Sequence, residues 1–285
     1  MTNWVARLAS KYLPVPDSLS GERADAALAK MLGISRSQAA DLLAEGSVTR
    51  AGKVIGKSDR LEIDQIIEVE LVERSTEPEV IAQDVAELKV VFQDEHMIVI
   101  DKPAGVVSHP SLGFDGPSVP GVLLARGIQL ATSGAQERQG IVQRLDVGTS
   151  GLMVLAKGER AYSVLKQAFR DRTVKKTYHA LAQGHPDPAQ GTIDTPIARS
   201  TKHDYKFTIS ADGKNAVTHY KTIELLPSAA LMEIGLETGR THQIRVHLQS
   251  IGCFIVGDPL YGSVKINKEL NLNQQMLHAY SLHFT

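Results

Sequence analysis

The sequence predicts an α+β protein in which a large domain built around a sheet follows a small α+β module. The chain has 285 residues, of which 42% are hydrophobic, and this is enough for one large domain together with a small one. After residue 88, apolar residues alternate or run together over many short stretches, as they do in β-strands. Helical spacing is rare in that part, so a regular β-α-β repeat is not expected.

The small module is predicted at residues 17–72. Apolar side chains within 21–32 have the spacing of one helical face. In the next stretch Ser35 precedes Gln38 by three residues, which is the pattern of a capping box at a helix start. Gly46 favours the end of that second helix. Short β-prone pieces follow, and the alternation typical of a strand is seen at Ile67, Val69 and Leu71.

The larger domain is predicted at residues 88–285, after an acidic and polar linker at 73–87. Two apolar runs flank Asp94 and Glu95, as in a β-hairpin. Further strands are expected at 152–157, 176–184, 215–226 and 231–238. Helices are expected between them, at 159–171 and 242–252.

The composition excludes several classes of protein. The formal net charge is −1, so a surface that binds nucleic acid would have to be local. The single cysteine, Cys253, excludes an internal disulfide and a multi-cysteine zinc site, and it fits a reducing compartment. No apolar run is long enough for a membrane span, and the N-terminus lacks the pattern of a secretory signal. We therefore predict a cytoplasmic protein without a membrane segment.

Familiar cofactor and hydrolase motifs are not found in the sequence. There is no Walker A loop and no G-x-G-x-x-G, and the glycine spacing in GTSG differs from that of a serine-hydrolase elbow. His242 and His247 are five residues apart and lack the glutamate of H-E-x-x-H, so a metal site is not expected. We predict no nucleotide cofactor and no metal.

Polar residues interrupt apolar segments in four stretches, which are the candidates for chemistry. They read DKPAGVVSHP at 101–110, QRLDVGTSGLMVLAK at 143–157, KKTYHALAQG at 175–184 and TGRTHQIRVHLQSIG at 238–252. A fifth stretch, GDPLYG, follows at 257–262. Together these motifs resemble the RluA-type pseudouridine synthases, which include the RluC and RluD-like enzymes, over about residues 88–285. Residues 17–72 resemble an S4 RNA-binding domain.

The resemblance implies a fold, an activity and a set of partners. It implies a mixed, largely antiparallel sheet crossed by an active-site cleft, and a reaction without cofactor or metal. The implied substrate is large-subunit, 23S-type ribosomal RNA, and we predict that the protein acts as a monomer.

The resemblance also assigns three residues. Asp146 matches the catalytic aspartate, Tyr178 matches the tyrosine that packs on the target base, and Arg245 matches the basic residue that pairs with the aspartate. The plainer alternatives are a turn residue, a core aromatic and a surface salt-bridge partner, respectively. Pseudouridine formation breaks the N1–C1′ bond of uridine and joins C5 to C1′. The carboxylate of Asp146 could attack as a nucleophile or remove a ribose proton, and both routes stay open.

Physical chemistry indicates what the two neighbours contribute. A free aspartate is already ionised at neutral pH, so Arg245 is expected to orient Asp146 more than to ionise it. Stacking on an aromatic ring such as Tyr178 stabilises an extruded base by roughly 1–3 kcal/mol. This offsets part of the cost of flipping the base out of its stack.

RNA contacts are expected where basic residues gather. Residues 157–178 hold seven basic residues against two acidic ones and lead into Tyr178, and phosphate contacts there would make binding salt-dependent. The alternative is an ordinary solvated helix face. Arg144 could contact the RNA backbone or support its own loop. The candidate RNA contacts are Arg144, Lys175 and Lys176, and in the small module Arg36, Arg50 and Lys53.

Two departures from the family pattern affect the prediction. Gln143 stands where the family has histidine, and it can form hydrogen bonds but cannot carry a charge. The chain also ends at LHAYSLHFT, earlier than is usual in the family. Gln143 favours one rival, a catalytically silent RNA-binding or ribosome-assembly protein, whereas the intact Asp146 argues against it. A second rival is a synthase that acts on transfer RNA.

Overall fold

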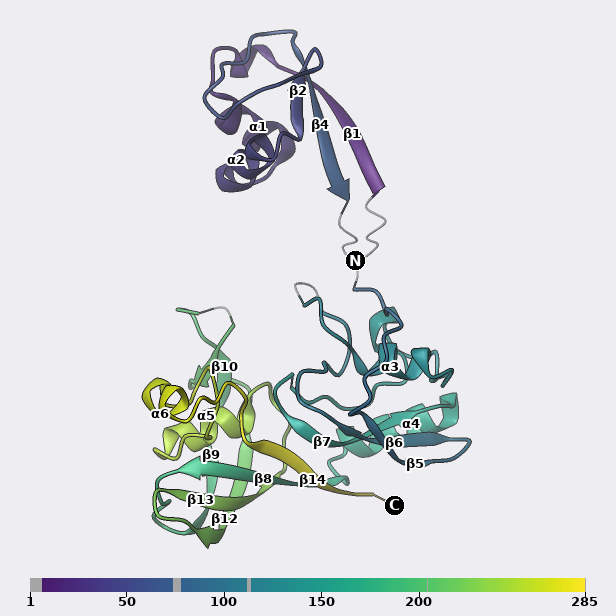
Figure 1. Ribbon diagram of the computed structural model, residues 1–285, viewed down its shortest axis with the longest axis vertical. Coiled ribbons are helices and arrows are strands. Elements are labelled where there is room, and N and C mark those ends of the chain that lie inside the picture. The colour runs from purple at the N-terminus through teal and green to yellow at the C-terminus, as the bar shows by residue number, and fades with distance from the viewer. Residues whose placement is uncertain (1–6, 74–77, 112–113, 204, 285) are drawn as a thin grey trace. The chain divides into compact units, whose positions relative to one another are not determined.

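The computed structural model describes residues 7–73, 78–111, 114–203 and 205–284. Its internal contacts divide the chain into two compact units, residues 1–76 and 77–285 (Figure 1). Within the described ranges, every helix is too short or too polar to cross a membrane.

The small unit combines two helices with a four-stranded sheet. Its strands follow the order β1-β4-β2-β3. Its elements are β1 (Arg7–Pro14), η1 (Asp17–Leu19), α1 (Ala24–Leu32), α2 (Arg36–Ala44), β2 (Val48–Arg50), β3 (Lys53–Val54) and β4 (Ile66–Glu73). The predicted range of 17–72 leaves out β1, which pairs with β4 along its whole length. The unit therefore begins earlier than predicted, because the partner that makes β1 a strand lies far along the chain.

The helix signals in the small unit are confirmed. Ser35 Oγ accepts a hydrogen bond from the Gln38 N–H at 3.2 Å, and Gln38 Oε1 accepts one from the Ser35 N–H at 3.0 Å, which is the expected capping box. Both helices pack on one face of the sheet through a buried apolar cluster that includes Leu28, Leu43 and Ile67.

The large unit is built on an eight-stranded sheet with the order β5-β6-β7-β14-β8-β13-β12-β9. Only the β7–β14 pair is parallel, so the mixed, largely antiparallel sheet is confirmed. The strands are β5 (Lys89–Gln93), β6 (Met97–Lys102), β7 (Ser150–Ala156), β8 (Lys175–Gln183), β9 (Gln190–Asp194), β12 (Val217–Leu225), β13 (Ala229–Leu236) and β14 (Leu277–His283). A separate two-stranded ribbon joins β10 (Ile197–Arg199) and β11 (Phe207–Ile209).

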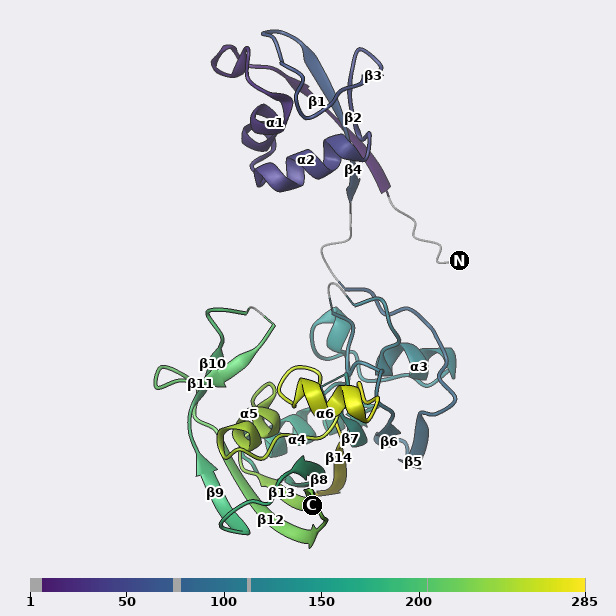
Figure 2. The same ribbon diagram turned by 60° about the vertical axis from the view of Figure 1, so that its left-hand side comes forward.

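Helices cover both faces of this sheet. They are α3 (Val119–Ala125), η2 (Gln136–Arg138), α4 (Glu159–Arg170), α5 (Gln243–Ser250) and α6 (Val264–Glu269). In β6, Ile98 and Ile100 join the main apolar cluster with α3 and α5, whereas Met97 and Val99 pack with α4 on the other face. Figures 1 and 2 show α3 and α4 beside the β5–β6–β7 half, and α5 and α6 beside the half formed by β8, β9, β12 and β13.

The centre of the sheet is where the chain's motifs meet. Strand β8 lies between β13 and β14, so that Tyr178 pairs with Ile234 on one side and with Ala279 on the other. Gly151, at the start of β7, has φ +114°, and a Cβ there would lie 2.4 Å from the Ala279 carbonyl oxygen. Only glycine allows β7 and β14 to approach this closely, and the segment before β7 therefore has a fixed entry into the sheet.

Candidate active site

Asp146 lies in an irregular segment just before β7, and hydrogen bonds hold that segment on both sides of it. Ser108 Oγ accepts the Leu145 N–H at 2.7 Å and donates to the Leu145 carbonyl at 2.9 Å. The Gly105 N–H donates to the Val147 carbonyl at 2.7 Å. The stretch at 101–110 thus fixes the backbone of the stretch at 143–157, while the Asp146 side chain stays 19% exposed.

Two hollows meet at Asp146. The larger has a volume of about 520 Å³, within the usual range of ligand sites, and its lining includes Ser108, Leu260 and Gln274. The smaller, of about 80 Å³, is lined by Tyr178 and by residues next to α5. The residues common to both hollows are Arg144, Leu145, Asp146, His242 and Arg245. The carboxylate is therefore open to a ligand from two sides.

Arg245 makes its main contact with a second acid, Asp258. Its Nε and Nη2 donate to the two carboxylate oxygens of Asp258 at 2.6 and 2.8 Å, and the Asp258 side chain is fully buried. The remaining Nη1 lies 3.7 Å from Asp146 Oδ2. The arginine is thus brought to Asp146 as expected, but Asp258 determines its orientation. At 5% exposure, Arg245 is not a surface ion-pair partner.

Burial and pairing act in opposite directions on the pKa values of this ion pair. Burial alone would lower the pKa of Arg245, but the hydrogen bonds and charge of Asp258 outweigh it and hold that pKa above its usual value. Burial alone would raise the pKa of Asp258, and Arg245 together with two backbone N–H groups holds it below its usual value instead. Both groups are therefore charged at neutral pH.

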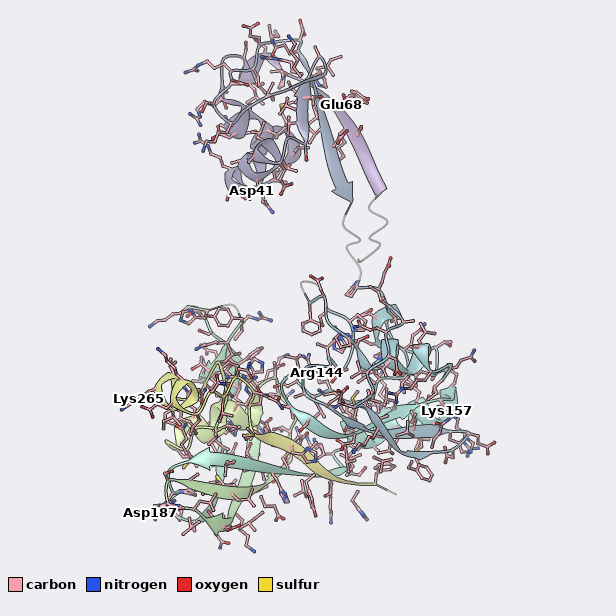
Figure 3. All side chains as sticks on the ribbon, in the orientation of Figure 1. Asp41, Glu68, Arg144, Lys157, Asp187 and Lys265 are labelled. Carbon is pink, nitrogen blue, oxygen red and sulfur yellow. The ribbon has the colours of Figure 1, made fainter. Side chains whose placement is uncertain are left out.

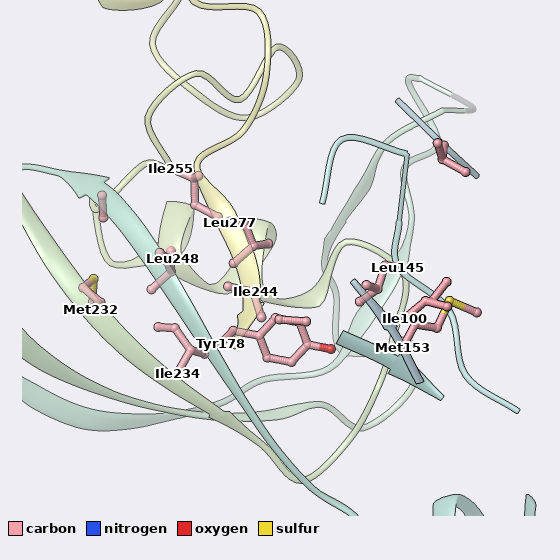
Figure 4. Packing of buried hydrophobic residues seen from close by; sticks show 14 of the residues in the cluster. Ile100, Leu145, Met153, Tyr178, Met232, Ile234, Ile244, Leu248, Ile255 and Leu277 are labelled. Atoms are coloured by element: carbon pink, nitrogen blue, oxygen red, sulfur yellow. The ribbon is translucent and has the colours of Figure 1, made fainter. Parts of the chain in front are cut away.

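Tyr178 belongs to the core and to the smaller hollow at once. It is only 9% exposed, and burial raises the pKa of its hydroxyl, with a further contribution from the charge of Asp146. Figure 4 shows its ring beside Ile234 and Ile244, with the hydroxyl directed toward Leu145. The core packing that the plainer alternative expected is present, and the same ring also lines the hollow that Asp146 enters.

Gln143, which stands in place of the family's histidine, is turned onto the sheet. Its Nε2 donates to the Leu152 carbonyl of β7 at 3.3 Å. It is not among the residues that line either hollow. A role in shaping the loop before Asp146 follows from this contact.

The candidate RNA contacts of the large unit do not all lie near Asp146. Tyr178 and Lys176 have the same parity along β8 and point to the same face, and a Cβ on Gly239, which lines the smaller hollow, would lie 3.9 Å from Lys176 Nζ. Burial, aided by the charge of Arg172, lowers the pKa of Lys176. Lys175 is exposed and points to the opposite face.

The basic stretch that includes α4 is separated from the site. Helix α4 packs on the sheet face opposite to Tyr178, and Lys157 Nζ donates to the Asp94 carbonyl. Arg144 is exposed at the rim of both hollows, and Figure 3 shows it well apart from Lys157. Contacts with the nucleotide next to Asp146 are therefore open to Arg144 and Lys176 rather than to α4.

The three candidates in the small unit differ in how much they are engaged. Arg36 donates to Asp25 at 3.1 to 3.3 Å, and it joins Arg23 in lowering the pKa of Asp25 to about 2. Arg50 donates to the Arg60 carbonyl and to a glutamine oxygen, both at 3.2 Å. Lys53 is exposed on β3.

In the large unit, Asp258 and Lys102 are buried charged residues that sequence reasoning did not single out, although both lie in recognised motifs. Lys102 occupies a core position of β6, and its Nζ donates to the Pro103 and Val106 carbonyls at 2.9 and 2.7 Å. Burial lowers its pKa to about 8, against a partial opposing effect of Asp146. The sequence did contain a sign of this position, because Lys102 follows Ile98 and Ile100 at every second residue of an alternating strand. Among the described residues, no group of three or more His, Cys, Asp or Glu side chains is placed to hold a metal ion.

Comparisons with known proteins assign a class to this fold and site. A family model described as RNA pseudouridylate synthase matches residues 96–250, which include Asp146, Tyr178 and Arg245. The protein is thus an enzyme that acts on RNA. More narrowly, the chain belongs to the RluA-type RNA pseudouridine synthases, the family that its motifs predicted.

The relatives match nearly the whole chain. An uncharacterized RNA pseudouridine synthase of Mycobacterium bovis is 49% identical over 97% of this chain and 90% of its own length. A protein of Zymomonas mobilis named ribosomal large subunit pseudouridine synthase D is 37% identical over 96% of this chain and 89% of its own. Among solved structures, human RNA pseudouridylate synthase domain containing 1 matches with a TM-score of 0.59 and 26% identity, over 70% of this chain and 79% of its own.

Proposed function

We propose that this enzyme converts uridine to pseudouridine in large-subunit ribosomal RNA, with Asp146 as its catalytic group. The observation that carries the proposal is the position of the Asp146 carboxylate where two hollows meet, within 3.7 Å of Arg245. The substrate class is supported by the names of relatives such as that of Zymomonas mobilis.

The proposed reaction needs no second substrate, because every bond broken and formed lies within the uridine. The N1–C1′ bond of uridine breaks, the uracil turns, C5 bonds to C1′, and the C5 proton leaves while N1 gains one. No electrons are gained or lost overall, so we propose that no redox cofactor takes part. Attack on the sugar and removal of a ribose proton both require an ionised carboxylate with one free oxygen.

The neighbouring side chains support this chemistry in different ways. Arg245, fixed by Asp258, orients Asp146 without forming a close ion pair with it, since Nη1 stays 3.7 Å from Oδ2. Tyr178 lines the smaller hollow, where we propose that its rigid ring packs against the extruded uracil. We propose that Arg144 and Lys176 meet the phosphates beside that nucleotide.

We propose that the small unit, from β1 to β4, is an S4-like RNA-binding domain. Its three candidate RNA contacts differ in whether their side chains already form hydrogen bonds within the unit. Lys53 is exposed, whereas Arg36 and Arg50 already donate to groups within the unit. We further propose that the enzyme works as a monomer in the cytoplasm.

Tritium release tests the proposal directly, because the C5 hydrogen must leave when the new carbon–carbon bond forms. Ribosomal and transfer RNA labelled with tritium at uridine C5 are incubated with the full chain, with Asp146→Asn and with Asp212→Asn as a control. Asp212 lies exposed in a turn before β12. The unmodified chain and Asp212→Asn should release tritium from large-subunit RNA, while Asp146→Asn should bind that RNA and release none.

The other outcomes identify the rivals. Release from transfer RNA alone would establish a transfer-RNA synthase and overturn the proposed substrate. Binding of RNA without release by the unmodified chain would favour a silent RNA-binding protein. Equal release by Asp146→Asn would remove Asp146 from the catalytic role.

A further inference from the structure

His242 forms part of the wall between the two hollows, although no motif reading gave it a role there. It precedes α5 and lines both hollows. Its backbone has φ 57° and ψ 19°, in the left-handed region that is uncommon for residues other than glycine, although asparagine, aspartate and histidine adopt it more often than most. A strained backbone that the surrounding structure maintains is often found at functional positions.

The His242 ring is held in one orientation. The rings of Phe207 and Tyr261 meet it edge-on, with centroid distances of 5.4 and 5.5 Å and interplanar angles of 79° and 74°. Its Nδ1 lies 2.8 Å from Tyr261 Oη. These contacts direct the opposite nitrogen, Nε2, toward Asp146.

The contacts of Tyr261 favour one tautomer of His242. Tyr261 Oη accepts the Phe207 N–H at 2.7 Å. Within the described part of the chain, His242 Nδ1 is the one acceptor that the hydroxyl reaches. With the Phe207 N–H on one lone pair of the oxygen, the hydroxyl proton is free to go to Nδ1, and this arrangement puts the proton of the neutral imidazole on Nε2.

Two donors therefore flank the same oxygen of Asp146. His242 Nε2 lies 3.9 Å and Arg245 Nη1 lies 3.7 Å from Oδ2. Both distances exceed a hydrogen bond by about 1 Å, so the two groups orient Oδ2 without forming a close ion pair with it. Among the described residues, no hydrogen bond reaches Oδ1, and the shortest contacts of His242 and Arg245 with this carboxylate are both to Oδ2.

We infer that His242 is a positioning residue which, as a neutral Nε2–H donor, fixes Oδ2 of Asp146 together with Arg245 and leaves Oδ1 to react with the ribose. The inference rests on the proposed catalytic role of Asp146. It assigns separate tasks to the two carboxylate oxygens and holds for both routes that the reaction could take.

Burial, rather than the surrounding charges, keeps the His242 ring neutral. Burial lowers the pKa of His242, and this outweighs the opposing effect of Asp146. The titratable and charged groups that face the ring are Asp146, Arg245, Asp258, Arg144 and Tyr261. Because the ring stays uncharged, it orients the carboxylate without neutralising it.

Two substitutions of His242 distinguish the effect of its Nε2–H donor from the effect of its left-handed backbone. Asparagine adopts the left-handed region readily, so His242→Asn relieves the backbone while its short amide falls short of Asp146. His242→Gln carries an amide nitrogen near the place of Nε2. Single-turnover tritium release and the RNA dissociation constant are measured for both His242 variants, for the unmodified protein and for Asp146→Asn.

We expect His242→Asn to slow the reaction without weakening RNA binding. His242→Asn should lower the single-turnover rate at least tenfold with RNA affinity within twofold of the full chain, and His242→Gln should regain at least threefold over His242→Asn. Histidine ¹⁵N spectra of the full chain should show the Nε2–H tautomer of His242, and in Tyr261→Phe the Nδ1–H form should appear.

Three results would overturn the inference. They are an unchanged rate in His242→Asn, a fall in rate matched by a fall in affinity, and an Nδ1–H tautomer in the full chain. Failure of the proposed function is a distinct outcome, because it would show as normal turnover by Asp146→Asn, while the tautomer spectrum does not depend on activity.

Discussion

Asp258→Asn should lower the free energy of unfolding of the large unit by about 3–5 kcal/mol, the usual cost of breaking a buried ion pair on one side. Asp258 is fully buried and Arg245 is 5% exposed, so water cannot solvate the guanidinium that the substitution leaves unpaired. The asparagine oxygen can still accept from the backbone N–H groups of Leu260 and Tyr261, which Asp258 binds at 2.8 and 3.0 Å. Its NH₂ group, however, would face the N–H groups of Arg245.

Urea denaturation followed by circular dichroism measures this loss at pH 7, with Asp212→Asn as the exposed control. The control should stay within about 0.5 kcal/mol of the full chain. The double variant Asp258→Asn with Arg245→Gln should be at most about 1 kcal/mol less stable than the worse single variant, since the large cost arises from one uncompensated charge. A loss below about 1 kcal/mol in Asp258→Asn, or additive losses in the double variant, would refute the reasoning.

Three further predictions concern the segments around the site. The folded chain releases the proton of Lys102 at a pKa of about 8, whereas the unfolded chain keeps it to about 10.5. The free energy of unfolding should therefore rise by about 3 kcal/mol between these pH values, and urea denaturation of Lys102→Met should lack that rise. Gly151→Ala should cost at least about 2 kcal/mol in the same assay, because its Cβ would lie 2.4 Å from a carbonyl oxygen of β14 at φ +114°, whereas Gly158→Ala, with nothing within 4 Å, should cost less than about 1 kcal/mol. Gln143→His should change single-turnover tritium release by less than tenfold, because Gln143 donates to the Leu152 carbonyl and lines neither hollow.

Elements with local signals could be predicted from the sequence. The helix at Arg36–Ala44 follows from its capping box, and the hairpin of β5 and β6 follows from two apolar runs around Asp94. In that hairpin Asp94 Oδ1 accepts the N–H groups of His96 and Met97 at 2.8 and 2.7 Å, as turn chemistry expects.

Strands whose partners lie far along the chain were missed. β1 depends on β4, and β14 enters the sheet between β7 and β8, which precede it by about a hundred residues or more. The segment Leu277–His283 has no clean alternation, because a bulge between Ala279 and Ser281 changes which face its side chains meet. Local periodicity does not contain this information.

The candidate site shows the same division. Asp146, Tyr178 and Arg245 each lie within a short motif, and the fold brings all three to the smaller hollow. The pairing of Arg245 with Asp258 could not be read from spacing, since it depends on how the chain turns after α5. The basic stretch around α4 was judged by charge alone, and charge does not indicate which face of a sheet a helix covers.

Under the catalytic role proposed for Asp146, the buried Arg245–Asp258 pair explains how this carboxylate can lie beside a guanidinium and still react. A carboxylate bound closely by its own arginine is oriented, but its charge is largely neutralised. Here two hydrogen bonds of 2.6 and 2.8 Å commit the arginine to Asp258, and Asp146 meets it only at 3.7 Å. The pair contributes no net charge, so the site keeps the negative charge of Asp146 itself. Orientation and reactivity, which would conflict in a simple ion pair, are thus supplied by different residues.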